Sequence, residues 1–174
     1  IQLPHQLTSG IHRINTTLTF PDSSLDRKTY SVSILSSQTK ILTKIKPQIL
    51  KAGWGNPRLN KSIENNSLKV KGEIFPWGIG THTDSRASFD LKSGYKKLNI
   101  SMGMDDEAMC GDGAIFIIHG DGKELFRSQP IYGEEVINAE VSVNGIKILD
   151  LITLQGETDL CDHSNWLNPW LTRF

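Results

Sequence analysis

Apolar and polar residues alternate with a period of two along most of this chain, which is the pattern of β-strands that bury one face. The alternating runs span residues 14–20, 30–34, 68–74, 87–91, 98–104 and 137–143. A helical period of about 3.6 is almost absent, and the one helical turn that we expect lies near residues 56–59. Because the runs are short and separated by turn-forming residues, the sequence predicts an all-β sandwich or barrel, and we favour the sandwich.

Turn-forming residues mark where neighbouring strands should be connected. A cluster at residues 21–24 separates the first two runs. Asp121-Gly122 and Asn144-Gly145 each lie between two apolar runs, and both dipeptides suit the positive φ angles of tight hairpin turns. We therefore expect a β-hairpin at each of these two dipeptides.

Length and charge limit the classes of partner. The 174 residues fit one domain, and 19 basic residues balance 19 acidic ones, so no basic field favours nucleic acid or an anionic membrane surface. The longest apolar run, residues 114–118, is much shorter than the roughly twenty residues of a spanning helix. We expect no nucleic acid and no membrane as partners. The chain starts at Ile1 without an initiator Met or a leader, which favours a processed protein or an excised fragment.

Aromatic and polar residues are concentrated in three segments, residues 53–90, 101–113 and 155–170. Trp54 and Trp77 each lie among glycines and prolines, where an indole on a loop can stack against the C–H face of a sugar. Each could equally be a core residue that packs beneath its loop.

The same segments also contain a group of polar side chains. His82 and the stretch Asp162-His163-Ser164-Asn165-Trp166 combine imidazole, carboxylate and amide groups, which suit hydrogen bonds to sugar hydroxyls. A purely structural role for either histidine is the alternative. The spacing of the histidines matches no zinc motif.

Asp105, Asp106 and Glu107 form an acidic turn, followed by Asp112. Carboxylates on a flexible loop suit a hard cation such as calcium, although the spacing does not match the helix–loop–helix calcium motif. A solvated acidic turn is the alternative.

We assign no catalytic residue. Two carboxylates could hydrolyse a glycosidic bond, but the sequence gives no means of pairing them, and neither a Gly-x-Ser-x-Gly elbow nor a phosphate-binding loop is present. Cys161 and His163 are too close in sequence to be assigned as nucleophile and base. The two cysteines, Cys110 and Cys161, could be separate buried thiols or a disulfide between loops, which would indicate an oxidising compartment.

Taken together and in order, these motifs resemble the family 51 carbohydrate-binding modules, also called the NPCBM type, from about residue 41 to residue 171. The elements that carry the resemblance are Gly53-Trp54-Gly55, Asn60-Lys61-Ser62-Ile63, Gly78-Ile79-Gly80-Thr81-His82, Phe89-Asp90-Leu91, Gly103-Met104-Asp105-Asp106 and Asp162-His163-Ser164-Asn165-Trp166. Thr83, Ser164-Asn165 and the cysteine pair depart from the family pattern.

The resemblance implies a galactose-binding-domain-like jelly-roll, a two-sheet antiparallel β-sandwich. It also implies a module that binds galactose-containing glycans, is appended to a glycoside hydrolase or another secreted protein, and is associated with calcium. We expect residues 41–174 to be this module, and residues 1–40 to be an N-terminal β extension or the remnant of a neighbouring domain. Since the family match places the loops of Cys110 and Cys161 at neighbouring ends of the sandwich, we expect a disulfide between them.

We therefore predict a non-catalytic carbohydrate-binding module that is secreted or displayed at the cell surface. The expected stacking residues are Trp54, Trp77 and Trp166, the expected hydrogen-bonding residues are His82, Asp162, His163 and Asn165, and the expected calcium ligands are Asp105 and Asp106. The alternatives are a protein–protein interaction module, in which the same aromatic loops form the contact, and a small hydrolase.

Overall fold

The computed structural model describes residues 10–108 and 110–173, and this part of the chain is nearly all β. Its strands are β1 (Gly10–Thr19), β2 (Leu25–Ile34), β3 (Thr39–Ile41), β4 (Ile49–Lys51), β5 (Arg58–Leu59), β6 (Leu68–Val70), β7 (Glu73–Phe75), β8 (Gly78–His82), β9 (Ser85–Asp90), β10 (Lys97–Met104), β11 (Ala114–Gly120), β12 (Lys123–Arg127), β13 (Val136–Ser142), β14 (Ile148–Gln155) and β15 (His163–Thr172). A single 3-10 turn, Leu42–Lys44, follows β3. No helix among the described residues has the length and apolar character needed to cross a membrane.

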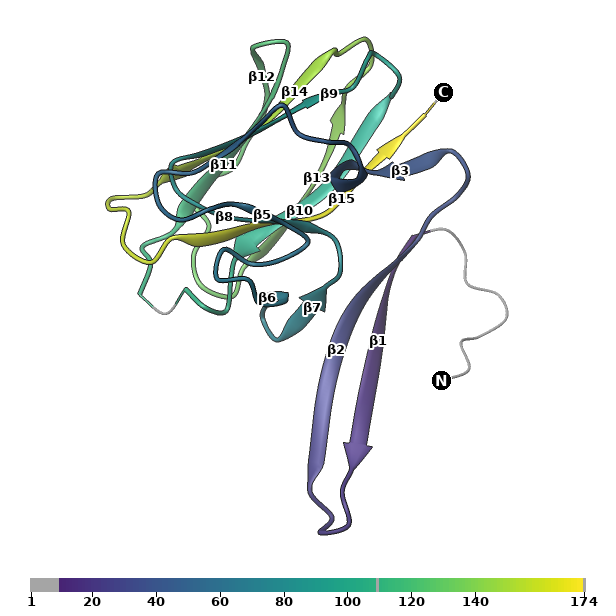
Figure 1. Cartoon of the computed structure of the whole chain (residues 1–174), viewed down its shortest axis with the longest axis vertical. Helices are drawn as coiled ribbons and strands as arrows, with labels where there is room; N and C mark the ends of the chain where they lie inside the picture. The colour runs from purple at the N-terminus through teal and green to yellow at the C-terminus, as the bar shows by residue number, and fades with distance from the viewer. Residues whose placement is uncertain (1–9, 109, 174) are drawn as a thin grey trace.

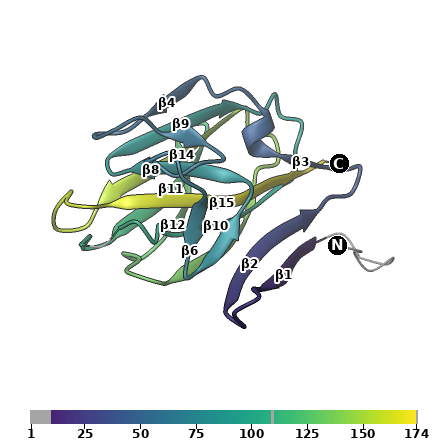
Figure 2. The same ribbon diagram turned by 60° about the horizontal axis from the view of Figure 1, so that its bottom comes forward.

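Two antiparallel sheets pack face to face (Figures 1 and 2). One has the strand order β13-β10-β15-β8-β5, with β3 paired to the far end of β15, and the other has the order β12-β11-β14-β9-β4. Every strand pair in these two sheets is antiparallel. The predicted two-sheet antiparallel β-sandwich is confirmed.

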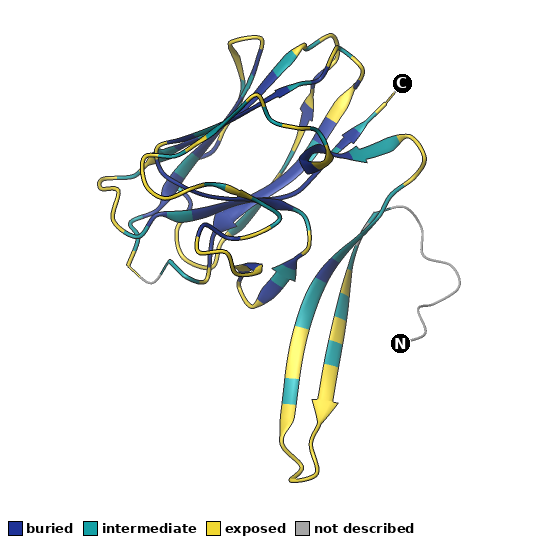
Figure 3. Ribbon diagram, viewed as in Figure 1, coloured by how far each residue is buried: buried dark blue, intermediate teal, exposed yellow. Residues whose placement is uncertain are grey.

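The core lies between the two sheets, where the inward-facing residues of the alternating runs meet (Figure 3). Phe116 on β11 and Trp166 on β15 make an edge-on contact across it, with ring centroids 5.0 Å apart. Neither ring is more than 1% exposed, and burying side chains of this size stabilises the fold by roughly 3 kcal/mol each. The aromatic pair therefore connects the two sheets directly.

An N-terminal hairpin of β1 and β2 projects from the sandwich (Figure 1). It is joined to the body by a short parallel pairing of β2 with β7 in a third sheet, of order β1-β2-β7-β6. Its polar face contacts the sandwich, because Asn168 of β15 donates a hydrogen bond to the Ser31 hydroxyl at 2.7 Å. Its opposite face carries Ile14, Tyr30 and other apolar residues around a surface hollow of about 450 Å³. A domain division at residue 40 stays a prediction.

Three local predictions are wrong. Residues 68–74 do not form one strand, because Lys71 and Gly72 both have positive φ and turn β6 back onto β7. Asn144-Gly145 does not make a hairpin, since β13 pairs with β10 in one sheet while β14 pairs with β9 and β11 in the other. An Asn-Gly turn can equally carry the chain between sheets. The helical turn expected near residues 56–59 is the strand β5.

Candidate functional site

Three aromatic side chains meet at one end of the sandwich. The Trp54 indole lies 5.4 Å from the His82 imidazole and 5.6 Å from the His163 imidazole, measured between ring centroids. The two imidazoles are 5.6 Å apart. Trp54 and His163 are nearly parallel, at 12°, and Trp54 is 52% exposed. We call these three residues the aromatic cluster.

The positions of the cluster follow from strand register and one close backbone approach. β8 ends at His82 and β15 begins at His163, and the two residues are paired opposite each other in the antiparallel ladder. Trp54 comes from the loop between β4 and β5, where a Cβ atom at Gly53 would lie 3.0 Å from the Thr83 carbonyl oxygen. The absence of a side chain at Gly53 thus lets the Trp54 loop pack against the end of β8.

His82 has a defined hydrogen-bonding state in its neutral form. Its Nδ1 lies 2.8 Å from the Thr83 carbonyl oxygen, and because a carbonyl only accepts, Nδ1 carries the proton. The remaining nitrogen, Nε2, is then an acceptor, and it has no hydrogen-bond partner among the described residues. Nε2 is therefore the atom of His82 that can accept a hydrogen bond from a ligand, although only 4% of the residue is exposed.

His163 is held in a partly buried polar environment. Its Nδ1 is buried, has no hydrogen-bond partner within the part of the chain that the structure describes, and lies 3.9 Å from Oε2 of Glu107. Burial lowers the pKa of His163, and the neighbouring His82 lowers it further. Glu64 and Glu107 act in the opposite direction. The neutral imidazole is therefore favoured at this position.

Asp162 lies behind the cluster rather than on its surface. It is fully buried, its Oδ2 accepts a hydrogen bond from the Thr83 hydroxyl at 3.2 Å, and its Oδ1 has no partner among the described residues. Burial raises the pKa of Asp162 to about 6, with a further contribution from Asp112, while the Thr83 hydrogen bond opposes it. Asp162 thus connects the start of β15 to Thr83, the residue after β8, and its burial shields it from a ligand.

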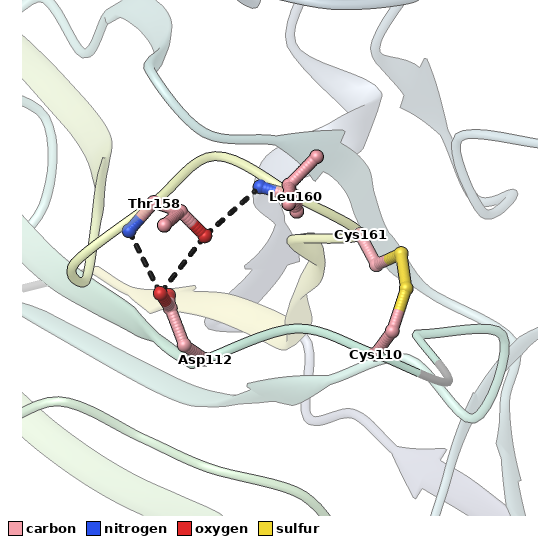
Figure 4. Close-up of a disulfide and its surroundings, with 5 residues drawn as sticks. All are labelled: Cys110, Asp112, Thr158, Leu160 and Cys161. Atoms are coloured by element: carbon pink, nitrogen blue, oxygen red, sulfur yellow. Dashed lines mark hydrogen bonds between the residues drawn. A yellow bond between two sulfur atoms is a disulfide. The ribbon is translucent and has the colours of Figure 1, made fainter.

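A disulfide between Cys110 and Cys161 closes the loop next to this site (Figure 4). The two Cα atoms are 5.4 Å apart, and Cys161 directly precedes Asp162 and His163. Asp112 fixes the same loop by accepting hydrogen bonds from the backbone amide and the hydroxyl of Thr158, at 2.7 and 2.9 Å. The segment that carries His163 is therefore tied to the loop after β10 at two points.

Three other residues expected at the site lie elsewhere. Trp166 is in the core, 1% exposed. Asn165 is fully buried and donates a hydrogen bond to Asp105. Trp77 comes just before the start of β8, whereas His82 is at its end, so about 16 Å of extended strand separate the two residues. The Lys44 ammonium lies 4.5 Å from the centroid of the Trp77 ring.

The two carboxylates expected to bind calcium are occupied by hydrogen bonds. Asp105 is 3% exposed and accepts from Asn165 and from the backbone amides of Lys69 and Glu107. Asp106 accepts from the amides of Lys71 and Gly72. Within residues 10–108 and 110–173, no group of three or more His, Cys, Asp or Glu is placed to hold a metal ion. A calcium site at these carboxylates stays a prediction.

Two residues that contribute to the site were not among the predicted ones. Thr83 anchors both His82, through its carbonyl, and Asp162, through its hydroxyl. Glu107 lies beside His163 and accepts hydrogen bonds from Ser62 and Asn66. Glu107 could have been noticed as the third carboxylate of the acidic turn, whereas nothing in the sequence pairs Thr83 with a residue 79 positions away.

Comparison with known proteins places this architecture in a family. The family model described as the NPCBM/NEW2 domain matches residues 38–172, which is most of the chain. The chain belongs to the NPCBM/NEW2 family. A Renibacterium salmoninarum protein that carries the name of an endo-alpha-N-acetylgalactosaminidase is 29% identical over 124 residues. That alignment covers 67% of this chain but only 8% of the relative, so this NPCBM/NEW2 chain corresponds to a small part of that protein.

Solved structures share the fold of this NPCBM/NEW2 chain. The CBM51 of the Clostridium perfringens GH95 protein, in complex with methyl-galactose, superposes with a TM-score of 0.70 at 24% identity and covers 77% of this chain and 99% of that one. The CBM51-2 and INT domains of C. perfringens ZmpB, in complex with GlcNAc, superpose with a TM-score of 0.72 at 20% identity and cover 95% of this chain and 38% of that one. The second alignment is long enough to extend into the N-terminal hairpin.

Proposed function

We propose that this chain is a non-catalytic carbohydrate-binding module that recognises galactose-containing glycans at the aromatic cluster. The observation that carries the proposal is the half-exposed indole of Trp54, flanked by two imidazoles at 5.4 and 5.6 Å. Such an arrangement offers a flat apolar face next to two imidazoles that can form hydrogen bonds. Trp54, His82 and His163 themselves include no carboxylate, whereas glycoside hydrolysis requires two.

The geometry suits a galactoside for a physical reason. The axial hydroxyl of galactose leaves an apolar C–H patch on one face of the ring, and this patch can stack on the Trp54 indole. The Nε2 atom of His82 then accepts a hydrogen bond from that hydroxyl, as its Nδ1 is already engaged with the Thr83 carbonyl. Each hydrogen bond to the sugar replaces a hydrogen bond to water, so it stabilises the complex by only about 1 kcal/mol. We expect a dissociation constant on the order of 10⁻⁵ to 10⁻³ M.

The relatives support the same class of ligand. One similar structure was determined with methyl-galactose and another with GlcNAc, and the matching part of the R. salmoninarum protein is a small segment of a chain named for a glycosidase. By analogy, this module is attached to a catalytic domain and brings it to a glycan. The disulfide favours a secreted or cell-surface location, because such bonds persist in oxidising compartments.

Calorimetric titration with galactose, lactose, GlcNAc and glucose tests the ligand assignment. We expect the wild type to prefer galactosides, Trp54→Ala to abolish detectable binding, and His82→Ala to weaken it by about 1–3 kcal/mol. Trp77→Ala is the matched control, since it removes an indole remote from the cluster and should leave the affinity unchanged. If the wild type binds no galactoside, or if Trp77→Ala is as damaging as Trp54→Ala, the proposed site is wrong. Absence of released reducing sugar from a galactoside polymer tests the non-catalytic role.

Calcium bound at Asp105 and Asp106 remains a separate prediction of the sequence, and the hydrogen bonds described above do not favour it. Any ion that binds only the folded state raises the melting temperature by mass action. The test compares the melting temperature of chelator-treated protein before and after addition of millimolar calcium. An unchanged value would leave both carboxylates with a purely structural role.

A further inference from the structure

A second surface pocket lies at the other end of the sandwich from the aromatic cluster. It has a volume of about 490 Å³, and its lining includes Lys40, Asp90, Lys92, Tyr95 and Arg173. β15 runs from His163 at the aromatic cluster to Thr172, next to Arg173, so about 30 Å of extended strand separate the two sites. Figure 1 shows the loop before β15 and the C-terminal end of β15 at opposite sides of the molecule. One ligand of monosaccharide size cannot contact both.

Three cations from separate segments converge on this pocket. Lys40 lies on β3, Lys92 in the loop between β9 and β10, and Arg173 directly after β15. None of the three forms an ion pair with a carboxylate among the described residues. The one acidic residue in the lining, Asp90, uses its Oδ1 to accept a hydrogen bond from the Lys92 backbone amide at 2.9 Å. The pocket therefore carries net positive charge.

The floor of the pocket is apolar and aromatic. Leu91 and Tyr95 are 2% and 6% exposed, and Ile45 lines the same hollow. The Arg173 guanidinium lies 5.6 Å from the Tyr95 ring centroid, a cation–π contact that orients the arginine over the floor. Cations above an apolar floor suit a ligand that has both an anionic group and a ring with C–H faces.

The charge of the two ends is opposite, although the chain as a whole is neutral. The loop at residues 91–96, beside this pocket, holds two lysines and no acidic residue. The loop at residues 156–162, beside the aromatic cluster, holds two exposed acidic residues, Glu157 and Asp159, besides the buried Asp162, and no basic one. The charges of these two loops thus favour an anionic ligand at the pocket over one at the aromatic cluster.

We propose that this pocket is a second binding site, independent of the aromatic cluster, and that it takes an acidic sugar, one carrying a carboxylate or a sulfate ester. Lys40, Lys92 and Arg173 contact the anionic group, and the sugar ring lies against the apolar side of the pocket at Ile45, which is only partly buried. The module then binds acidic glycans at this pocket, independently of the ligand bound at the aromatic cluster.

The experiment is a titration of isotopically labelled protein followed by backbone amide chemical shifts. The probes are glucuronate and N-acetylneuraminate for the carboxylate, galactose 6-sulfate for the sulfate ester, neutral galactose, and inorganic sulfate. We expect the amides of Leu91, Lys92, Gly94 and Tyr95 to shift with acidic sugars only. Comparison of the carboxylate and sulfate probes identifies which anionic group the pocket takes. Raising the sodium chloride concentration from 50 to 500 mM should weaken this binding several-fold through screening.

Two charge-neutralising variants and one control separate the pocket from general electrostatic attraction. Lys92→Gln and Arg173→Gln should each weaken acidic-sugar binding at least fivefold, while Arg27→Gln, at an exposed position on the hairpin, should leave it unchanged. Trp54→Ala should also leave it unchanged, which keeps this result distinct from failure of the galactoside proposal. The proposal is overturned if the acidic sugars shift other amides, if Arg27→Gln weakens binding equally, or if inorganic sulfate binds as tightly as the sugars.

Discussion

His82 and His163 are cross-strand partners whose ring centroids lie 5.6 Å apart at the open end of the β8–β15 pair. Their spacing is set by the register of two paired strands, and a register shift by one residue would turn a side chain to the other face of the sheet. Trp54, in contrast, depends on the loop between β4 and β5. The cluster thus combines two rings fixed by the sheet with one ring placed by a loop.

Gly80→Ala should strongly destabilise the fold. A Cβ atom at this position would lie 2.3 Å from the Lys61 carbonyl oxygen and 2.4 Å from the Ser62 Cα, and neither backbone atom can move without disturbing β8. We expect the free energy of unfolding to fall by at least about 2 kcal/mol. Gly94→Ala is the control, because its nearest neighbour would be 3.4 Å away. Urea denaturation measures both, and equal stability of the two variants would show that β8 tolerates a side chain at residue 80.

Asp162 should make stability fall as pH rises from about 4 to about 6. Its pKa is about 6 in the folded state against 3.8 for a free carboxyl, so in this window the folded protein holds a proton that the unfolded chain has lost. The lowered pKa of His163 acts in the opposite direction, since the unfolded chain binds the additional proton there as pH falls.

The comparison of wild type with Asp162→Asn isolates the carboxylate. Because asparagine does not titrate, the stability of Asp162→Asn relative to wild type should rise between pH 4 and pH 6. Glu157→Gln, an exposed change in the same loop that is not among the groups shifting the pKa of Asp162, should follow the wild-type profile. The measurement is urea denaturation at half-unit pH steps, and parallel profiles for wild type and Asp162→Asn would contradict the assignment.

Removal of the disulfide should lower stability without changing the fold. The bond closes a sequence separation of 51 residues, and loop-closure entropy for that length corresponds to about 4 kcal/mol. We expect Cys110→Ser/Cys161→Ser to lose a free energy of this order and to keep the far-ultraviolet spectrum of a β-protein. Intact mass without reductant should be two hydrogen atoms below that of the reduced chain. A mass equal to the reduced formula would exclude the bond in solution.

Asn168 should control how firmly the N-terminal hairpin is held. It is 1% exposed and bridges to Ser31 at 2.7 Å and to Ser33 at 3.4 Å. Asn168→Gly removes both contacts while it tolerates the positive φ of 44°. We expect amides of β2 to exchange about tenfold faster with solvent, whereas those of β14 change much less. Ser33→Ala, which removes only the longer bond, should have a smaller effect, and unchanged exchange in Asn168→Gly would assign the attachment to other contacts.

The sequence predicts strands well where one face is exposed, as in β13, because the alternation then survives in the residue order. It does not predict β8, which is buried at every position and shows no alternation. It predicts connections less well: Asn144-Gly145 has the same composition whether it closes a hairpin or carries the chain between sheets. The motif Asp162–Trp166 illustrates the limit for the site. Neighbouring side chains of a strand point to opposite faces, so Trp166 is turned into the core, away from the face of His163. Asn165 shares the face of His163, but it is buried further along β15, where it donates a hydrogen bond to Asp105. Contacts such as that of Thr83 with Asp162 depend on folding and leave no local signal.

The attachment of the hairpin has a consequence for where this chain can be shortened. The family match begins at residue 38, after β2 has ended. A truncated chain that starts there would uncover the edge of β7 that now pairs with Thr29 and Tyr30, and would leave the amide of Asn168 without its two serine partners. An uncovered strand edge recruits other chains. We therefore expect a fragment that starts at residue 38 to associate with itself more readily than one that starts at Gly10.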